Sequence, residues 1–301
     1  MQERGTRLKA RIRNWKEAFS DETSGIYSTL ADLHWKYAAF RTAVAIIRHA
    51  NDHPGKGHHP NRMLFDLIAE SFWMGTLLGV RRLLDRGDLT GDKGVFSLRS
   101  VIKDVEACSG QLTRRVFVEE IADLPYDYEA IERAEYEHLK SLPPGTPVWG
   151  STEAFTSRLR HEHFDFLSGV SAPDRRPRDK IRKEIFDRLE ARLTTLDGIA
   201  KHVSTHIAHA GNSKSRTGWE LSQFDTRDAR SALKELTEVA HLAGGWFAYD
   251  GASELAVAQY DKFEGLDLPL ISTEGIEDLE RNWQRVEQDI SSWLLVKATD
   301  L

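Results

Sequence analysis

Apolar residues recur three or four positions apart along almost the whole of this 301-residue chain, which is the spacing of helices that each bury one face. Alternating polar and apolar runs bounded by turn residues, the pattern of half-buried strands, are nearly absent. A chain of this kind buries its apolar stripes by packing helices against one another. The sequence therefore predicts an all-α fold, a bundle of about eight helices.

Prolines, glycines and capping residues divide this pattern into segments. The expected helices cover residues 6–19, 25–51, 61–84, 97–108, 113–142, 151–169, 226–247 and 275–295. Pro125 is the point at which the helix over 113–142 can be interrupted. A further long helix is expected from a cap at Asp179 to about His209, where Gly211 and Asn212 supply the residue types that end helices.

The length of the chain allows either one large helical domain or two smaller ones. No segment repeats at a fixed period, so a repeat architecture is not expected. We expect a single all-helical domain over residues 1–301, with residues 110–177 as a possible insertion within it.

The charge and cysteine content bound the class of protein. Cys108 is the only cysteine, so no intrachain disulfide can form. The start of the chain has no apolar leader and no stretch has the 18 or so apolar residues of a membrane span, so we expect a cytoplasmic protein without a membrane partner. The net charge of −6 argues against broad nucleic-acid binding, although residues 175–192 hold eight basic against four acidic side chains.

The segment from Lys201 to Asn212 carries most of the functional information, because it contains three histidines. On a helix, His202, His206 and His209 fall within about 60° of one another and border the face that meets the core. One histidine on such a helix is usually structural. Three on one face favour a site that uses imidazole, either as a metal ligand or for proton transfer.

A metal site is the weaker interpretation. His202 and His209 would lie about 10.5 Å apart along a helix, so one helix cannot bring all three rings to one ion. The pair His161 and His163 falls on different helical faces, and the chain has no His-Glu-x-x-His pattern, no phosphate-binding loop, no dinucleotide fingerprint and no nucleophile elbow. We therefore expect no metal and no cofactor.

Acid–base chemistry on RNA needs no metal. Imidazole can take the proton of a ribose 2′-hydroxyl or protonate the leaving 5′-oxygen, while a nearby cation stabilises the phosphate. Lys201, Ser204, Thr205 and His206 supply polar or cationic groups within two turns of His209.

Three stretches of the sequence resemble the HEPN superfamily, within its abortive-infection-like bacterial branch. They are Ser71–Asp85 (SFWMGTLLGVRRLLD), Phe96–Ile102 (FSLRSVI) and His206–Ala210 (HIAHA). Their order looks like the family's helix ending in Arg-Leu-x-Asp, a Ser-Leu helix start, and a late helix finishing in Ala-His.

The resemblance implies a helical bundle, frequently dimeric, in which an Arg-x(4–6)-His motif from each protomer forms a metal-independent ribonuclease site. His209 matches the motif histidine, but the positions that the spacing allows for the arginine hold Ser204, Val203 and His202. The cation would then come from elsewhere. The candidate catalytic residues are His209, His206, His202 and Lys201, and the candidate substrate-binding residues are Ser204, Arg81, Arg82 and Arg99. Asp85 is a candidate either to pair with Arg99 or to orient His209.

Two functions follow from these residues and from the resemblance. In the first, the chain is a HEPN-like protein of bacterial antiviral or stress defence that binds RNA and cleaves it without metal. In the second, it is a catalytically inactive HEPN-like scaffold that acts through homodimerisation or through a protein partner, such as an antitoxin or another defence protein.

Overall fold

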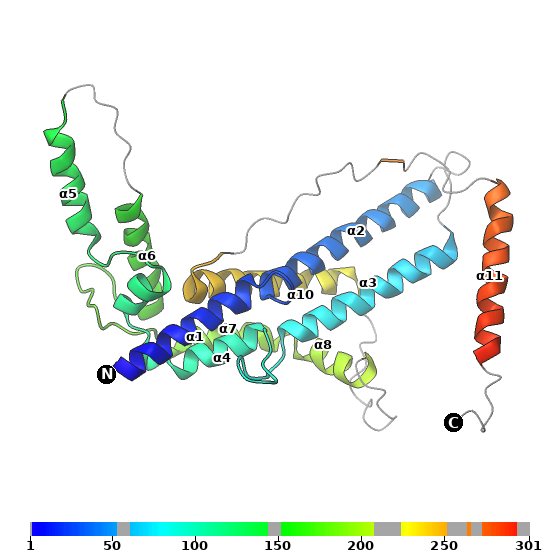
Figure 1. Ribbon diagram of the computed structural model, residues 1–301, viewed down its shortest axis with the longest axis horizontal. Coiled ribbons are helices and arrows are strands. Elements are labelled where there is room, and N and C mark those ends of the chain that lie inside the picture. Colours follow the sequence, from blue (N-terminus) through cyan, green and yellow to red (C-terminus); the bar gives the residue numbers. More distant parts are fainter. Residues whose placement is uncertain are drawn as a thin grey trace. The chain divides into compact units, whose positions relative to one another are not determined.

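The computed structural model describes residues 2–52, 61–143, 152–207, 224–251, 264–265 and 273–293. Within these ranges all the regular elements are helices (Figure 1). The one β-type pairing there is an isolated bridge between Thr113 and Lys180. The prediction of an all-α fold is confirmed.

The helices begin and end close to the predicted positions over most of the chain. In order they are α1 (Gln2–Ser20), α2 (Ile26–Asp52), α3 (Arg62–Leu83), α4 (Leu98–Ala107), the 3-10 turn η1 (Ser109–Gln111), the π-helix η2 (Val116–Ile121), α5 (Tyr128–Ser141), α6 (Glu153–Ser168), α7 (Lys183–Thr194), α8 (Asp197–His202), the π-helix η3 (Val203–Ile207), α10 (Thr226–Ala243), the π-helix η4 (Gly244–Ala248) and α11 (Thr273–Trp293).

Two compact units make up the chain. The first consists of Met1–Ala43 and Arg62–Ala256, and the second of Val44–Asn61 and Val257–Leu301. The first unit therefore contains every helix from α1 to η4 except the end of α2. The second unit contains that end of α2 together with α11.

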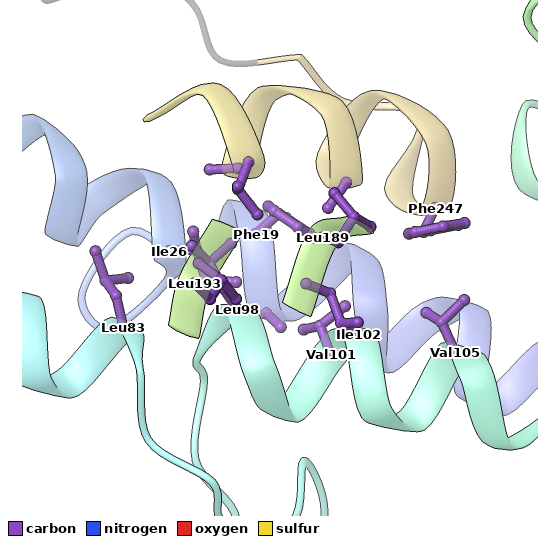
Figure 2. Close-up of a cluster of buried hydrophobic side chains, with 14 of the residues drawn as sticks. Phe19, Ile26, Leu83, Leu98, Val101, Ile102, Val105, Leu189, Leu193 and Phe247 are labelled. Atoms are coloured by element: carbon purple, nitrogen blue, oxygen red, sulfur yellow. The ribbon is translucent and has the colours of Figure 1, made fainter. Parts of the chain in front are cut away.

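The core of the first unit is built where α1, α4, α7 and α10 meet. Helix α4 shows why: Leu98, Val101, Ile102 and Val105 follow the spacing of one helical face, and all four are buried. Figure 2 shows these side chains directed at the same cluster as Phe19 of α1, Leu189 and Leu193 of α7 and Phe247 of η4. Each fully buried side chain of this size contributes about 1.5–3 kcal/mol to folding.

Helices α2 and α3 approach each other closely at a glycine. A Cβ on Gly79 of α3 would lie 2.6 Å from Leu33 Cδ2 of α2, so a larger residue would require the Leu33 side chain to shift. Beyond this point, Phe40 of α2 stacks on Phe72 of α3 with ring centroids 4.1 Å apart. The C-terminal half of α3 is thereby fixed in the core, where it buries Phe72, Thr76, Leu77, Val80 and Leu83.

Helix α3 also passes the length and composition test for a membrane span, alone among the helices in the described ranges. Of the apolar window, 22% is buried, and the buried residues of α3 lie between Phe72 and Leu83, toward its C-terminal end. The cytoplasmic location stays a prediction.

The long helix expected between Asp179 and His209 is wrong in two places. Asp179 does not cap a helix: its carboxylate accepts hydrogen bonds from Arg114 Nε at 3.0 Å and from the Arg176 backbone N–H at 2.8 Å. Helix α7 begins only at Lys183, after Arg182 in extended conformation. A buried arginine far away in the sequence has taken the carboxylate that the local pattern assigned to the cap.

The same helix is interrupted after Thr194. The hydroxyls of Thr194 and Thr195 donate to the carbonyls of Glu190 and Arg192, and such side-chain hydrogen bonds compete with the helical ladder. Leu196 leaves the helical conformation, and α8 starts at Asp197. The histidine segment therefore lies on a separate short helix, α8, and on η3.

The predicted helix over 113–142 is also divided, and here Pro125 marks the break as expected. The first part is η2, which ends at Ile121, and Asp123 then adopts a left-handed backbone conformation with φ of 53°. Asp127 caps α5 by accepting a hydrogen bond from the Ala130 N–H at 2.9 Å.

Arg160 of α6 connects two of the π-helices. Its guanidinium donates to the Phe117 carbonyl of η2 and to the Gly245 and Trp246 carbonyls of η4, at 3.3, 2.6 and 2.7 Å. The side chain is buried, with its Cζ 3.4 Å from the centroid of the Phe117 ring, and burial lowers its pKa to about 9. Through the two hydrogen bonds to η4, Arg160 attaches the 110–177 region to the core.

A matched pair of glycines tests the packing at the start of η4. A Cβ on Gly244 would lie 1.9 Å from the Tyr27 hydroxyl, which donates to the Asp250 carbonyl at 2.6 Å. We expect Gly244→Ala to displace the phenol and lower the free energy of unfolding by about 1–3 kcal/mol. Gly245→Ala meets nothing within 4 Å and should be neutral or slightly stabilising. Thermal unfolding followed by circular dichroism measures both, and equal transition temperatures for the two variants would contradict the close contact.

Candidate functional site

The candidate site lies on α8 and η3, where the chain changes from an α-helix to a π-helix at Val203. The imidazoles of His202 and His206 stack with centroids 4.4 Å apart and an angle of 14° between their planes. Both side chains are half-buried. These two members of the predicted histidine stripe therefore do share a face.

One nitrogen of the His206 ring is hydrogen-bonded within η3. Nδ1 lies 2.8 Å from Thr205 Oγ1, a hydroxyl that is also 2.9 Å from the Lys201 carbonyl. Either Oγ1 or Nδ1 carries the proton of this hydrogen bond. In the tautomer with the proton on Nδ1, the lone pair of the neutral ring is on Nε2, and the imidazole can act as a general base there.

Arg81, in the last turn of α3, reaches the same segment from another helix. Its Nε donates to Ser204 Oγ at 2.9 Å, and its Nη1 lies 3.7 Å from the Asp85 carboxylate. Two of the candidate substrate-binding residues, Arg81 and Ser204, are therefore in direct contact. Asp85 pairs with Arg81, and the hypothesis that it pairs with Arg99 is wrong.

Arg99 has other partners. Its Nη1 lies 2.5 Å from Asp197 Oδ1 and its Nε 3.2 Å from Glu190 Oε1, and only 5% of the residue is exposed. Arg86 approaches the same two carboxylates from the solvent side. Nη2 of Arg99 has no hydrogen-bond partner in the described structure but is buried, so a phosphate in solvent does not reach Arg99 in this arrangement. The ion pair with Asp197 fixes the start of α8.

The remaining candidate site residues are Arg82, Lys201 and Ser204, and each has a different environment. Arg82 is exposed and donates to the Ser24 carbonyl at 2.8 Å, away from the histidines. Lys201 is exposed at the end of α8. Ser204 is two residues from both His202 and His206, which is about half a helical turn, so Arg81 approaches from the side away from the stacked rings.

His209 lies outside the described residues, as do His53, His58 and His59. Among the residues that the structure does describe, no three His, Cys, Asp or Glu side chains are grouped so that they could hold a metal ion.

Sequence reasoning missed the most deeply buried charged side chain, Arg114. It donates to Asp165 and Asp179 and to the carbonyls of His161 and Val170, at 2.7–3.0 Å. In the sequence it is one arginine of a charged segment and resembles a surface residue. No local signal distinguishes it, because its partners are 47 to 65 residues away.

The burial of His161 is equally invisible in the sequence. The residue is 2% exposed, its Nε2 lies 2.9 Å from the Tyr126 carbonyl, and its ring packs against the rings of Tyr126 and Tyr128. Its Nδ1 has no partner in the described structure. Burial lowers the pKa of this imidazole, so the folded protein favours its neutral form. His163 is exposed, as expected for two residues on different faces.

No family model matches this chain, and neither the curated proteins nor the solved structures that were searched contain a match to it. Membership of the HEPN superfamily therefore stays a prediction from the three stretches of sequence.

The buried imidazole of His161 should make stability depend on pH. Its folded pKa is below the ordinary 6.5, so the unfolded chain binds a proton here at a higher pH than the folded chain. The free energy of unfolding should fall as the pH falls below about 6.5, by at most about 1.4 kcal/mol per pH unit for this group, and level off below the folded pKa.

The variant His161→Gln isolates this contribution, because the amide can still donate to the Tyr126 carbonyl but does not titrate. Urea unfolding between about pH 7 and pH 5 should give a shallower loss of stability than in the wild type. Identical slopes for the two proteins would show that His161 is not held neutral.

Proposed function

We propose that this chain is a HEPN-like helical scaffold that acts by binding a protein partner through the exposed apolar face of α3. The observation that carries the proposal is a set of large apolar side chains exposed to solvent on one helix. They are Met63, Leu64, Leu67, Ile68, Met74 and Leu78, each at least 40% exposed.

Single exposed apolar residues are normal, but a contiguous group on one face indicates a surface that binds another molecule. Leu64, Leu67, Ser71, Met74 and Leu78 are separated by alternate steps of three and four residues. Apolar residues with this spacing form a seam, the line along which one helix of a coiled coil packs against a second helix. A partner that offers an apolar helix fits this face.

The candidate arginines support the same proposal. Arg99 is occupied by Asp197 and Glu190, Arg82 by the Ser24 carbonyl, and Arg81 by Ser204 and Asp85. A phosphate would have to displace these groups, whereas the apolar face of α3 is already exposed. The resemblance to abortive-infection proteins suggests that the partner is an antitoxin or another component of bacterial antiviral or stress defence.

Site-specific photocrosslinking in the native cells tests this function. A photoreactive amino acid at Leu67, which is 58% exposed, should give one discrete adduct with a different protein. The same amino acid at Glu106, an exposed position on α4, should not. Leu64→Glu should weaken the Leu67 adduct by about tenfold or more, because it puts an unpaired carboxylate into the contact. Equal adducts from Leu67 and Glu106, or none, would contradict the proposal.

A second function is favoured by the stacked imidazoles of His202 and His206. In the tautomer with its proton on Nδ1, His206 has the chemistry to remove the proton of a ribose 2′-hydroxyl through Nε2, and the exposed Lys201 offers a cation where the motif arginine is missing. In this proposal the chain binds RNA and cleaves it without metal, with His209 as the motif histidine implied by the resemblance. A second protomer would complete the site, as the resemblance also implies.

Cleavage of a mixed RNA by the purified protein in the presence of a chelator tests the second function. His206→Ala and His209→Ala should each reduce the rate by about 10²-fold or more, and Lys201→Ala should reduce it as well. His138→Ala, at an exposed position on α5, is the control and should leave the rate unchanged. Absence of cleavage by the wild type would reject this function and leave the scaffold.

A further inference from the structure

Helix α11 has an apolar face without a partner in the described structure. Ile276, Leu279, Trp283 and Val286 are 45–57% exposed. They are separated by steps of three, four and three residues, and the sequence continues the alternation at Ile290 and Trp293. These are the a and d positions of three successive heptads.

Packing against a partner is what stabilises a helix with this face, because most helical stability in proteins comes from packing of the apolar face. A repeat of 3.5 residues keeps the seam in line with a second helix that has the same repeat. The 3.5-residue repeat of the apolar face therefore favours a second helix with the same repeat as its partner.

The first heptad of the seam favours two strands. Ile276 is β-branched and occupies an a position, while Leu279 occupies the following d position. In parallel coiled coils, this combination favours dimers over larger assemblies. The next heptad, with Trp283 at a and Val286 at d, does not follow this rule.

The charges beside the seam distinguish the possible orientations. The e positions are Glu280 and Glu287, and the g positions before them are Gly275 and Asn282. A parallel pair of identical helices sets each g residue beside the next e residue of the partner, so Gly275 faces Glu280 and Asn282 faces Glu287. No like charges meet in these pairs.

An antiparallel pair sets e positions against e positions. Glu280 of each copy would then lie beside Glu287 of the other, so two like-charged pairs would flank the short seam, and such pairs destabilise the assembly. We propose that α11 pairs with α11 of a second copy of this chain as a parallel, two-stranded coiled coil.

This pairing goes beyond the function proposed for α3. It uses the second compact unit, whereas the scaffold surface belongs to the first. Two copies joined at α11 would present two α3 faces, and a partner that also has two binding sites would be held more tightly than by one face. Failure of one proposal does not affect the other.

The mass of the full chain in solution tests the pairing, with two variants that add the same charge. Leu279→Glu places a carboxylate in the seam, and Gln284→Glu places one at an exposed b position of the same helix. We expect the wild type and Gln284→Glu to be dimers by light scattering and sedimentation. Leu279→Glu should dissociate at least about tenfold more readily. A monomeric wild type, or a dimer that is insensitive to Leu279→Glu, overturns the proposal.

Thermal unfolding excludes a folding defect as the cause. Leu279 is 53% exposed, so the main unfolding transition of Leu279→Glu should match that of Gln284→Glu. Val286→Lys tests the seam with the opposite charge and should dissociate in the same way. A dimer that Val286→Lys leaves intact also overturns the proposal.

A cysteine at Ile276 tests the orientation. In a parallel pair the two copies of residue 276 face each other and an Ile276→Cys variant should form an interchain disulfide under mild oxidation. In an antiparallel pair they would lie about 25 Å apart. The native Cys108 is buried, so the wild type should not crosslink and serves as the control. A dimer that does not crosslink through Ile276→Cys overturns the parallel arrangement.

Discussion

The buried guanidinium of Arg160 is the interaction on which the arrangement of the first unit depends. A charge taken out of water is costly unless its donors are satisfied, and here the acceptors are carbonyls of η2 and η4. Backbone carbonyls can accept only if both π-helices lie in the right place, so α6, η2 and η4 fix one another. Arg114 does the same for the chain around Asp165 and Asp179. Both arginines belong to the 110–177 region, which is therefore attached to the core by polar contacts as well as by apolar packing.

The candidate site depends on two departures from a regular helix. The break after Thr194 makes α8 a separate short helix, and Arg99 fixes its start through Asp197. The π-helix η3 follows directly and carries the stacked imidazoles. Short π-helical segments are rare and often occur at functional sites. The result is a histidine pair on one side of η3 and an arginine from α3 on the other.

Two helices leave apolar faces exposed for the same physical reason. In α3 the buried half packs against α2 and the core, but the first turns extend beyond that packing and keep Met63, Leu64 and Leu67 in solvent. In α11 the described part of the seam, from Ile276 to Val286, is exposed. A periodic apolar stripe directs a helix to bury one face, but it does not specify which element covers that face. Association with other chains is the function that such faces support best, and the acid–base chemistry at His206 is the alternative.

The sequence by itself determined the all-α class, most helix bounds, the break at Pro125 and the shared face of His202 and His206. Each follows from residues within a turn or two of one another, where spacing and capping control the backbone. Tertiary structure alone decided that Asp179 binds Arg114 in place of capping α7, that Asp85 pairs with Arg81, and that Arg99, Arg114 and Arg160 are buried. In the sequence a buried arginine looks the same as an exposed one. Its burial depends on acceptors that can lie as many as 98 residues away, and only the packed helices bring those acceptors within hydrogen-bonding distance.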